Sequence, residues 1–272
     1  MQRPTILVFD SGLGGLTVFR EIAKVRPDAR FVYAADDAMF PYGQMEEKRL
    51  VRRVLDVMEQ LFETYEPELA VIACNTASTV VMAPLRARFA QPFVGTVPAI
   101  KPACAASVTK QVTVLGTEGT VQREYTKALI REFASGCDVT LVGSSRLAAM
   151  AESELNGMPV SDGDIAAEIA PCFVERGGKR TDTIVLGCTH YPLLLERMIK
   201  VAPWPVNFID PAPAIARRVM ELLGPADPAL AALPATAVFT SDRTIAGPLA
   251  ATLNGFGIHE FQAGLAGAPE VG

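Results

Sequence analysis

The chain has few of the residues that hold metals or build disulfide scaffolds. Histidine occurs only twice, at His190 and His259, and none of the five cysteines belongs to a C-x-x-C pair of the kind found in structural zinc sites. An odd cysteine count without a secretory context also argues against a disulfide framework. We therefore predict neither a metal site nor disulfide bonds.

Long hydrophobic runs and an excess of positive charge are lacking too. The sequence contains no stretch of about 18 apolar residues, which a membrane-spanning helix would need. The opening MQRPTILVFD does not resemble a secretion signal. The 25 Lys and Arg are dispersed and are outnumbered by 30 Asp and Glu, which gives a net charge of −5. These features predict a cytoplasmic protein that binds neither nucleic acid nor a membrane.

The chain does contain a regular alternation of strand and helix patterns. Short runs rich in Val, Ile and Leu predict strands at residues 5–9, 31–36, 69–74, 93–97, 112–117, 139–143, 183–188 and 206–210. The clearest helix lies within residues 46–65, where apolar residues recur mostly at steps of three and four. Because the alternation of strands and helices begins again after the fourth strand, we expect an α/β fold with two similar domains and mainly parallel sheets.

Two short segments read alike: LAVIACNTAST at residues 69–79 and DTIVLGCTHYP at 182–192. In each, an apolar strand ends at a cysteine, Cys74 or Cys188, and polar residues then open a helix. A helix N-terminus favours negative charge, so both thiols should ionise more readily than a free one. Cys104, Cys137 and Cys172 lack this polar context and are interpreted as buried or incidental thiols.

Two thiols that face one substrate can invert a stereocentre. One removes a proton from carbon while the other delivers a proton to the opposite face. Because an α-proton is far less acidic than a thiol, charges and hydrogen bonds must stabilise the carbanion, and Asp10 and His190 are suitably placed helpers. A pyridoxal cofactor needs a Schiff-base lysine, and no lysine lies at a comparable strand end, so no cofactor is expected.

The first loop, VFDSGLGGLTV at residues 8–18, places Asp10 and Ser11 before three glycines. The spacing is not a dinucleotide signature, and no lysine follows as in a phosphate-binding loop. A tight turn and a ligand contact both explain the glycines. Asp10 favours a ligand, because a carboxylate that ends a buried strand needs a partner such as a substrate ammonium group.

Other polar residues lie at turns and at strand-to-helix junctions. The sequence Pro41–Tyr42–Gly43 predicts a rigid loop with an exposed aromatic side chain, although a plain turn has the same pattern. Threonines at such junctions either cap helices or bind anions. Taken together, the junction residues suit a small carboxylate ligand: Ser11, Asn75, Thr76, Thr117, Thr120 and Thr189.

The motifs DSGLGG, PYG, ACNTAS and LGCTHYP, in this order, resemble those of the cofactor-independent glutamate racemases of bacterial cell-wall synthesis. The resemblance extends to about residue 220 and is poor after residue 225. It implies two domains related by approximate two-fold symmetry, with glutamate bound between them and D-glutamate supplied for peptidoglycan. Residues 1–97 and 208–272 would form the first domain and residues 98–207 the second. A homodimer is also implied.

The resemblance further assigns roles to residues. Cys74 would deprotonate D-glutamate and Cys188 L-glutamate, with Asp10 and His190 assisting the adjacent thiols. Glu152 would be a further acidic residue of the site, although its segment SSRLAAMAE lacks the proline-containing run usual in the family. The implied substrate contacts are Asp10, Ser11, Pro41, Tyr42, Gly43, Asn75, Thr76, Thr117, Thr120, Thr189 and His190.

Three other functions are compatible with parts of this pattern. Aspartate racemases also use two cysteines but usually have Glu at the position of His190. A two-lobed binding protein for small carboxylates would need neither Cys74 nor Cys188. A hydrolase with Cys188 as nucleophile and His190 as base would leave the Cys74 motif unexplained.

Overall fold

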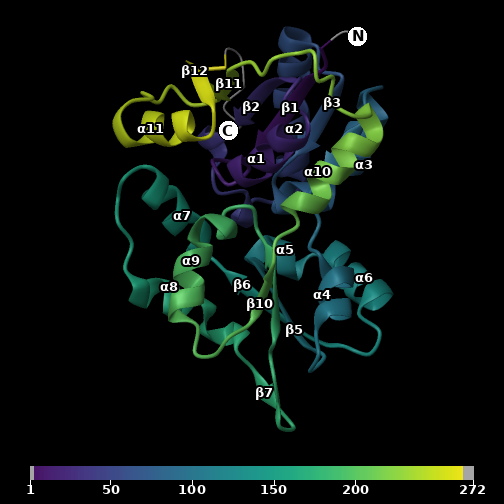
Figure 1. Cartoon of the computed structure of the whole chain (residues 1–272), viewed down its shortest axis with the longest axis vertical. Helices are drawn as coiled ribbons and strands as arrows, with labels where there is room; N and C mark the ends of the chain where they lie inside the picture. Colours follow the sequence, from purple (N-terminus) through teal and green to yellow (C-terminus); the bar gives the residue numbers. More distant parts are fainter. Residues whose placement is uncertain (1–2, 266–272) are drawn as a thin grey trace.

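Two parallel sheets organise the protein, which we describe over residues 3–265 from a computed structural model (Figure 1). The first sheet has the order β12-β11-β2-β1-β3-β4 and the second the order β10-β9-β5-β6. The strands of the first sheet are β1 (Thr5–Asp10), β2 (Arg30–Ala35), β3 (Leu69–Ile72), β4 (Phe93–Gly95), β11 (Ala235–Phe239) and β12 (Ile258–Gln262). Those of the second are β5 (Gln111–Thr117), β6 (Asp138–Ser144), β9 (Thr183–Gly187) and β10 (Asn207–Ile209).

Helices cover both faces of the first sheet. Strand β1 sends Ile6 and Val8 to one face and Leu7 and Phe9 to the other, and all four side chains are fully buried. A strand covered on both faces reads as a continuous apolar run, which is why the sequence does not alternate here. The helices on the first face are α1 (Leu16–Val25), α10 (Ala212–Leu223) and α11 (Gly247–Gly255); those on the second are α2 (Glu47–Tyr65) and α3 (Asn75–Arg88).

Each sheet with its covering helices forms a lobe, and the second lobe repeats this three-layer arrangement on a smaller scale. On one face lie α4 (Ile100–Ala106) and α6 (Glu124–Phe133), and on the other lie α7 (Leu147–Leu155), α8 (Asp162–Ile169) and α9 (Leu195–Val201). The short helix α5 (Glu118–Gln122) follows β5 directly. The remaining elements are the 3-10 turns η1 (Asp37–Met39), η2 (Tyr42–Gln44), η3 (Ala170–Cys172) and η4 (Tyr191–Leu194), and the hairpin of β7 (Glu175–Arg176) and β8 (Lys179–Arg180).

Both sheets have their topological switch at an equivalent place. From β1 the chain proceeds to β2 on one side and then to β3 on the other, and from β5 it proceeds to β6 and then to β9 in the same way. Ligands of open parallel sheets bind outside the carboxyl ends of strands at such a switch. The loops after β1 and β3, and those after β5 and β9, are therefore the expected positions for a site.

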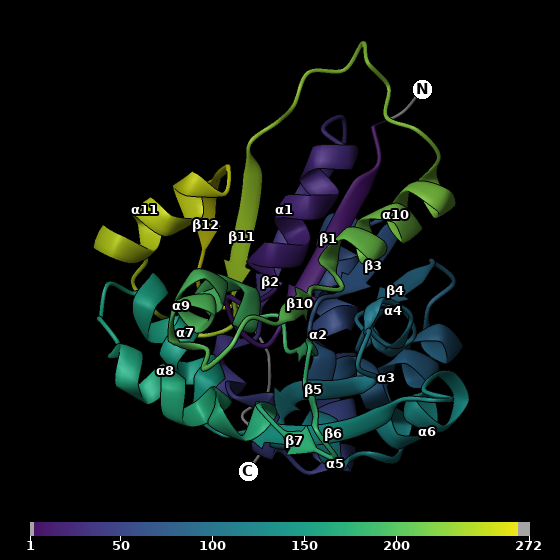
Figure 2. The same cartoon turned by 60° about the horizontal axis from the view of Figure 1, so that its bottom comes forward.

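The predicted α/β fold with two similar lobes is confirmed, and each of the eight predicted strands is present. The pattern missed β11 and β12, which follow the exposed loop after α10 (Figure 2). The division into domains stays a prediction. Its boundary at 207/208 would fall within β10, which pairs with β9 of the second sheet. Within residues 3–265, no helix is long and apolar enough to cross a membrane.

Candidate active site

Cys74 lies at the switch point of the first sheet. It follows β3, is the N-cap residue of α3, and is buried, with only 5% of its surface exposed. Its Sγ is 3.6 Å from the Oγ of Ser11, which follows β1. The neighbouring carboxylate of Asp10 is fully buried and accepts a hydrogen bond of 2.8 Å from the backbone N–H of Gly15. The loops after two adjacent strands thus place a thiol beside a carboxyl group.

Burial determines the acidity of this thiol. Loss of solvent raises the pKa of Cys74, and the Asp10 carboxylate raises it further, while hydrogen bonds from the backbone at Ala77 and from Ser11 oppose the shift. Cys74 does lie at a helix N-terminus, as the sequence predicts. Burial and Asp10 nevertheless raise its pKa by more than the favourable contacts there lower it. The expected easier ionisation of Cys74 is therefore wrong.

Cys188 lies at the equivalent place in the second sheet, directly after β9. Its Sγ is 3.7 Å from Nδ1 of His190, and Nε2 of His190 is 2.8 Å from Oε1 of Glu152. Burial alone would lower the pKa of His190, but its hydrogen bonds to Cys188 and Glu152 prevail and raise it well above the usual value. Only the 3-10 turn η4 follows Cys188, so the positive group beside this thiol is His190 and not the end of an α-helix.

Glu152 reaches this group from α7. Besides its contact with His190, its Oε1 accepts a 2.5 Å hydrogen bond from the backbone N–H of Leu13 in the first lobe. The glycines around Leu13 permit the approach, because a Cβ at Gly12 would lie 2.3 Å from Oε1 of Glu152 and one at Gly14 2.3 Å from Nδ1 of His190. The first loop therefore needs glycine in order to pack against the second lobe.

Three buried polar atoms near Cys74 have no hydrogen-bond partner. They are Oδ1 of Asp10 and both side-chain amide atoms, Oδ1 and Nδ2, of Asn75. Leaving such atoms unpaired costs about 1–3 kcal/mol each. A carboxylate and an amide held in this way match the ammonium and carboxylate groups of an amino acid, and a bound ligand would supply the missing partners.

Threonine hydroxyls join the two lobes next to Cys74. The Oγ1 of Thr76 is 2.9 Å from that of Thr117 and 3.3 Å from that of Thr120. Thr117 also caps α5 by accepting a hydrogen bond from the N–H of Thr120. The capping interpretation is confirmed, and the three hydroxyls still form one cluster that a carboxylate could bind. Thr189, whose carbonyl accepts from the hydroxyl of Thr17 at 3.1 Å, is buried beside Cys188.

The Pro41–Gly43 loop differs from its prediction. Pro41 is exposed, but Tyr42 is only 1% exposed, and its hydroxyl donates to the buried carboxylate of Asp36. The predicted exposed aromatic is therefore wrong. Asp36 also accepts from Arg53 on α2 and from Thr240 after β11, so that a buried ion pair fixes the loop.

Sequence reasoning missed three residues that support the site. Asp36 directly follows β2, and the rule applied to the other strand ends would have found it. Arg53 was included in a helix that was interpreted as core packing only. Arg123 donates to the carbonyl of Thr76 at 2.6 Å and to Oγ1 of Thr79 at 2.9 Å, and nothing in the sequence pattern indicates this bridge between lobes.

The arrangement is suited to two-sided proton transfer. Two buried cysteines occupy equivalent strand ends of two facing lobes, and each has an ionisable neighbour, Asp10 for Cys74 and His190 for Cys188. Among residues 3–265, no group of three or more His, Cys, Asp or Glu residues could hold a metal ion. This geometry has the features that a racemase requires.

Comparison with known proteins agrees with that class. The family described as Asp/Glu/Hydantoin racemase matches residues 16–219, and the chain belongs to this family. Among its relatives are the glutamate racemases of Brucella ovis, 56% identical over 223 residues (82% of this chain and 80% of the relative), and of Mesorhizobium japonicum, 54% identical over 246 residues (90% and 94%). The structure of Escherichia coli glutamate racemase in complex with L-glutamate and the activator UDP-MurNAc-Ala is similar, with 41% identity, a TM-score of 0.88 and coverage of 96% of this chain and 98% of that one.

Proposed function

We propose that this racemase interconverts L- and D-glutamate through Cys74 and Cys188, without a cofactor. The observation that carries the proposal is the pair of buried thiols at equivalent strand ends, next to Oδ1 of Asp10 and the side-chain amide of Asn75, which have no hydrogen-bond partner. Relatives at 54–56% identity that cover most of this chain are glutamate racemases, which supports glutamate over aspartate as the substrate. The D-glutamate formed would be used for peptidoglycan.

The two thiols have different roles in each direction. With L-glutamate, the thiolate of Cys188 takes the α-proton and the thiol of Cys74 gives its proton to the opposite face. One C–H bond breaks and one forms. After the reaction Cys188 is the protonated thiol and Cys74 is the thiolate. The raised pKa of Cys74 keeps it protonated as the donor, and His190, whose pKa is also raised, lies 3.7 Å from the Sγ of Cys188. D-glutamate reacts with the opposite protonation state.

Substrate binding would use the remaining polar groups. Asp10 and Asn75 are available for the ammonium group and one carboxylate, and the hydroxyls of Thr76, Thr117 and Thr120 are available for the other. Because these groups are buried and already positioned, they can stabilise the developing carbanion without reorganising.

The first test is proton exchange in heavy water. Purified protein is incubated with L-glutamate, and separately with L-aspartate, while optical rotation and the α-proton NMR signal are followed. We expect loss of both signals with glutamate only. Exchange with aspartate alone would mean that aspartate, and not glutamate, is the substrate. Inactivity with both amino acids in folded protein would favour a carboxylate-binding protein.

Substitution separates chemistry from binding. Cys74→Ala and Cys188→Ala should each abolish racemisation while glutamate still binds, as measured by calorimetry, because each thiol supplies one of two obligatory proton transfers. Cys172→Ala, which changes a buried thiol that the proposed mechanism does not use, is the matched control. Ordinary turnover by either of the first two variants would refute the two-thiol mechanism.

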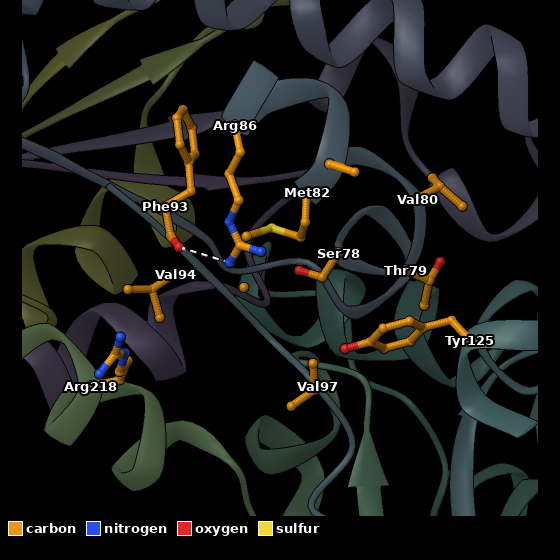
Figure 3. A pocket seen from close by; sticks show the side chains of 12 residues that line it. Ser78, Thr79, Val80, Met82, Arg86, Phe93, Val94, Val97, Tyr125 and Arg218 are labelled. Atoms are coloured by element: carbon orange, nitrogen blue, oxygen red, sulfur yellow. Dashed lines mark hydrogen bonds between the residues drawn. The ribbon is translucent and has the colours of Figure 1, made fainter. Parts of the chain in front are cut away.

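A second pocket favours a regulatory ligand as an additional function. It has a volume of about 460 Å³ and lies outside the thiol site, between α3, β4 and α10 (Figure 3). An adjoining cavity of about 320 Å³ shares four residues with it, including Arg218. Arg86, Arg218 and Lys101 line the two cavities, and none of their described lining residues is acidic. In a chain of net charge −5, this surface suits an anion.

The position of the pocket provides a route to the thiol site. Ser78 and Thr79 of α3 line it, and Cys74 is the N-cap residue of α3. Since the Escherichia coli relative was solved with the activator UDP-MurNAc-Ala, we propose a nucleotide-linked cell-wall precursor of that kind as the ligand. UDP-MurNAc-Ala should raise turnover of the natural protein, and Arg86→Met should weaken this response while basal turnover is kept. Arg88→Met is the matched control on the same helix, and absence of binding by calorimetry would refute the proposal.

A further inference from the structure

The chain after β11 belongs to the first lobe but holds α7 of the second lobe. Figure 1 shows α11 next to α7. Arg243 donates from Nη2 to Oδ1 of Asn156 at 2.8 Å, and Thr252 donates from Oγ1 to the carbonyl of Leu155 at 3.0 Å. Both acceptors lie at the C-terminal end of α7. The two lobes are therefore tied together at the end of one particular helix.

Arg243 is itself anchored in the first lobe. Its Nη1 is 3.4 Å from Oδ2 of Asp37, and its guanidinium lies 5.6 Å from the ring centre of Phe239. Asp37 is held in turn by the backbone N–H and the hydroxyl of Ser241. Because Arg243 forks between Asp37 and Asn156, it fixes the distance between the two lobes at this point.

From Asn156 the contacts lead to the thiol site. Its backbone N–H and its Nδ2 both donate to the carbonyl of Glu152, at 3.0 and 2.7 Å. The side chain of Glu152 contacts His190, which contacts Cys188. A displacement of the end of α7 would therefore move the carboxylate that holds the imidazole.

We propose that Arg243 is a positioning residue of the second thiol: by clamping Asn156 it keeps Glu152 against His190, and it does so from outside the site. The consequence for turnover rests on the proposed function, whereas the consequence for His190 does not. The charged and titratable groups that face His190 are Asp10 from β1, Cys188 directly after β9 and Glu152 from α7.

The titration of His190 distinguishes positioning from simple loss of charge. If Arg243 holds Glu152 in place, Arg243→Met releases the carboxylate and lowers the pKa of His190, because an anionic partner is lost. If Arg243 acted only as a nearby positive charge, its removal would raise the pKa of His190. The two explanations thus predict shifts of opposite sign.

The measurement is an NMR titration of the full-length protein. The chain has only two histidines, so His190 and the exposed His259 can both be followed, and His259 serves as the internal reference. We expect the pKa of His190 to fall in Arg243→Met, to recover at least partly in Arg243→Lys, and to stay unchanged in the control Arg88→Met, which breaks the exposed pair with Glu59. An unchanged or raised pKa in Arg243→Met would overturn the proposal.

Kinetics provide a second readout. Arg243→Met should lower kcat for glutamate about tenfold, because small displacements of catalytic groups have effects of that size or larger. In the background of Glu152→Gln the same substitution should have little further effect, since Arg243 acts through Glu152. If the effects of the two substitutions on kcat were fully additive, Arg243 would not act through Glu152, and the proposal would be contradicted.

Two further outcomes remain informative. Should Arg243→Met fold poorly, Thr252→Val removes the neighbouring tether with little change of shape and is expected to lower the pKa of His190 in the same direction. Should the natural protein not racemise glutamate, the proposed function fails, while the shift of His190 still decides whether Arg243 positions Glu152.

Discussion

Among single residues, the two thiols are buried to a similar extent, and it is their ionisable neighbours that differ. Cys74 faces a carboxylate and is held as a thiol, because burial and the charge of Asp10 both raise its pKa. Cys188 faces an imidazole whose pKa is raised, so a positive charge lies next to it. Two cysteines at equivalent backbone positions thereby have opposite electrostatic surroundings, which suits one proton donor and one acceptor.

Replacing the carboxylate beside Cys74 should change its reactivity. Asp10→Asn removes a negative charge that raises the pKa of Cys74, so the pKa should fall and alkylation by iodoacetamide near pH 8 should become faster. Mass spectrometry of the labelled peptides measures the rate at each cysteine. Cys172 is the internal control, because it is fully buried and burial raises its pKa to about 12. Slower labelling of Cys74 in the variant would contradict this assignment of the charge effect.

Glutamate should protect whichever thiol it covers. In the natural protein, saturating glutamate is expected to slow alkylation at Cys74 and Cys188 and to leave the half-exposed Cys137 unaffected. The same labelled peptides give this result. Equal protection of all three cysteines would indicate a general tightening of the fold and not occupancy of the site.

At the scale of elements, short connections after parallel strands bring the site together. The residues after β1, β3, β5 and β9 converge because these strands flank the two switch points. The Pro41–Gly43 loop is held from two sides, by the Asp36–Arg53 pair and by α5. Its contact with α5 is unusually close, because a Cβ at Gly119 would lie 2.7 Å from the carbonyl oxygen of Gly43.

A methyl group between α5 and this loop should therefore impair substrate binding. Gly119→Ala forces the backbone at Gly43 away from α5, and we expect KM for glutamate to rise about tenfold while the protein stays folded. Steady-state kinetics with circular dichroism measures both properties. Gly163→Ala is the matched control, since Gly163 is also helical and its nearest contact for a Cβ is 3.8 Å away. If both variants have the natural KM, the loop does not contribute to binding.

At the scale of the whole molecule, the site is shared between two lobes that the chain links repeatedly. Arg123 bridges from the second lobe to α3, and Arg243 bridges from the first lobe to α7. Threonine hydroxyls from both lobes meet beside Cys74. A substrate bound among these groups would add contacts to both lobes, so binding and stability should be coupled. The homodimer implied by the resemblance stays a prediction, which sedimentation velocity would test.

Glutamate should consequently stabilise the whole fold. At a concentration of 100 times Kd, a ligand that binds only the native state adds about 2.7 kcal/mol to the free energy of unfolding. Urea unfolding with racemic glutamate measures this effect and avoids a change of ligand during the experiment. Aspartate at the same concentration is the control for ionic strength. If glutamate left the free energy of unfolding unchanged, the native protein would not bind it.

Local sequence patterns predict most of the architecture and both thiols. Apolar runs buried on both faces predicted eight of the strands, and the repeated cysteine motifs placed Cys74 and Cys188 at strand ends, because these signals are local. The family resemblance added Glu152, which lies beside His190 in the structure.

How these residues behave depends on the packing of the whole chain. Burial of Cys74 reversed its expected acidity, and the interior position of Asp36 turned Tyr42 from an exposed side chain into a buried anchor. Arg243 lies in the segment that matches the family poorly, and its partners are distant in the sequence. Desolvation and contacts between distant segments depend on how the whole chain packs, and no local pattern of residues records them.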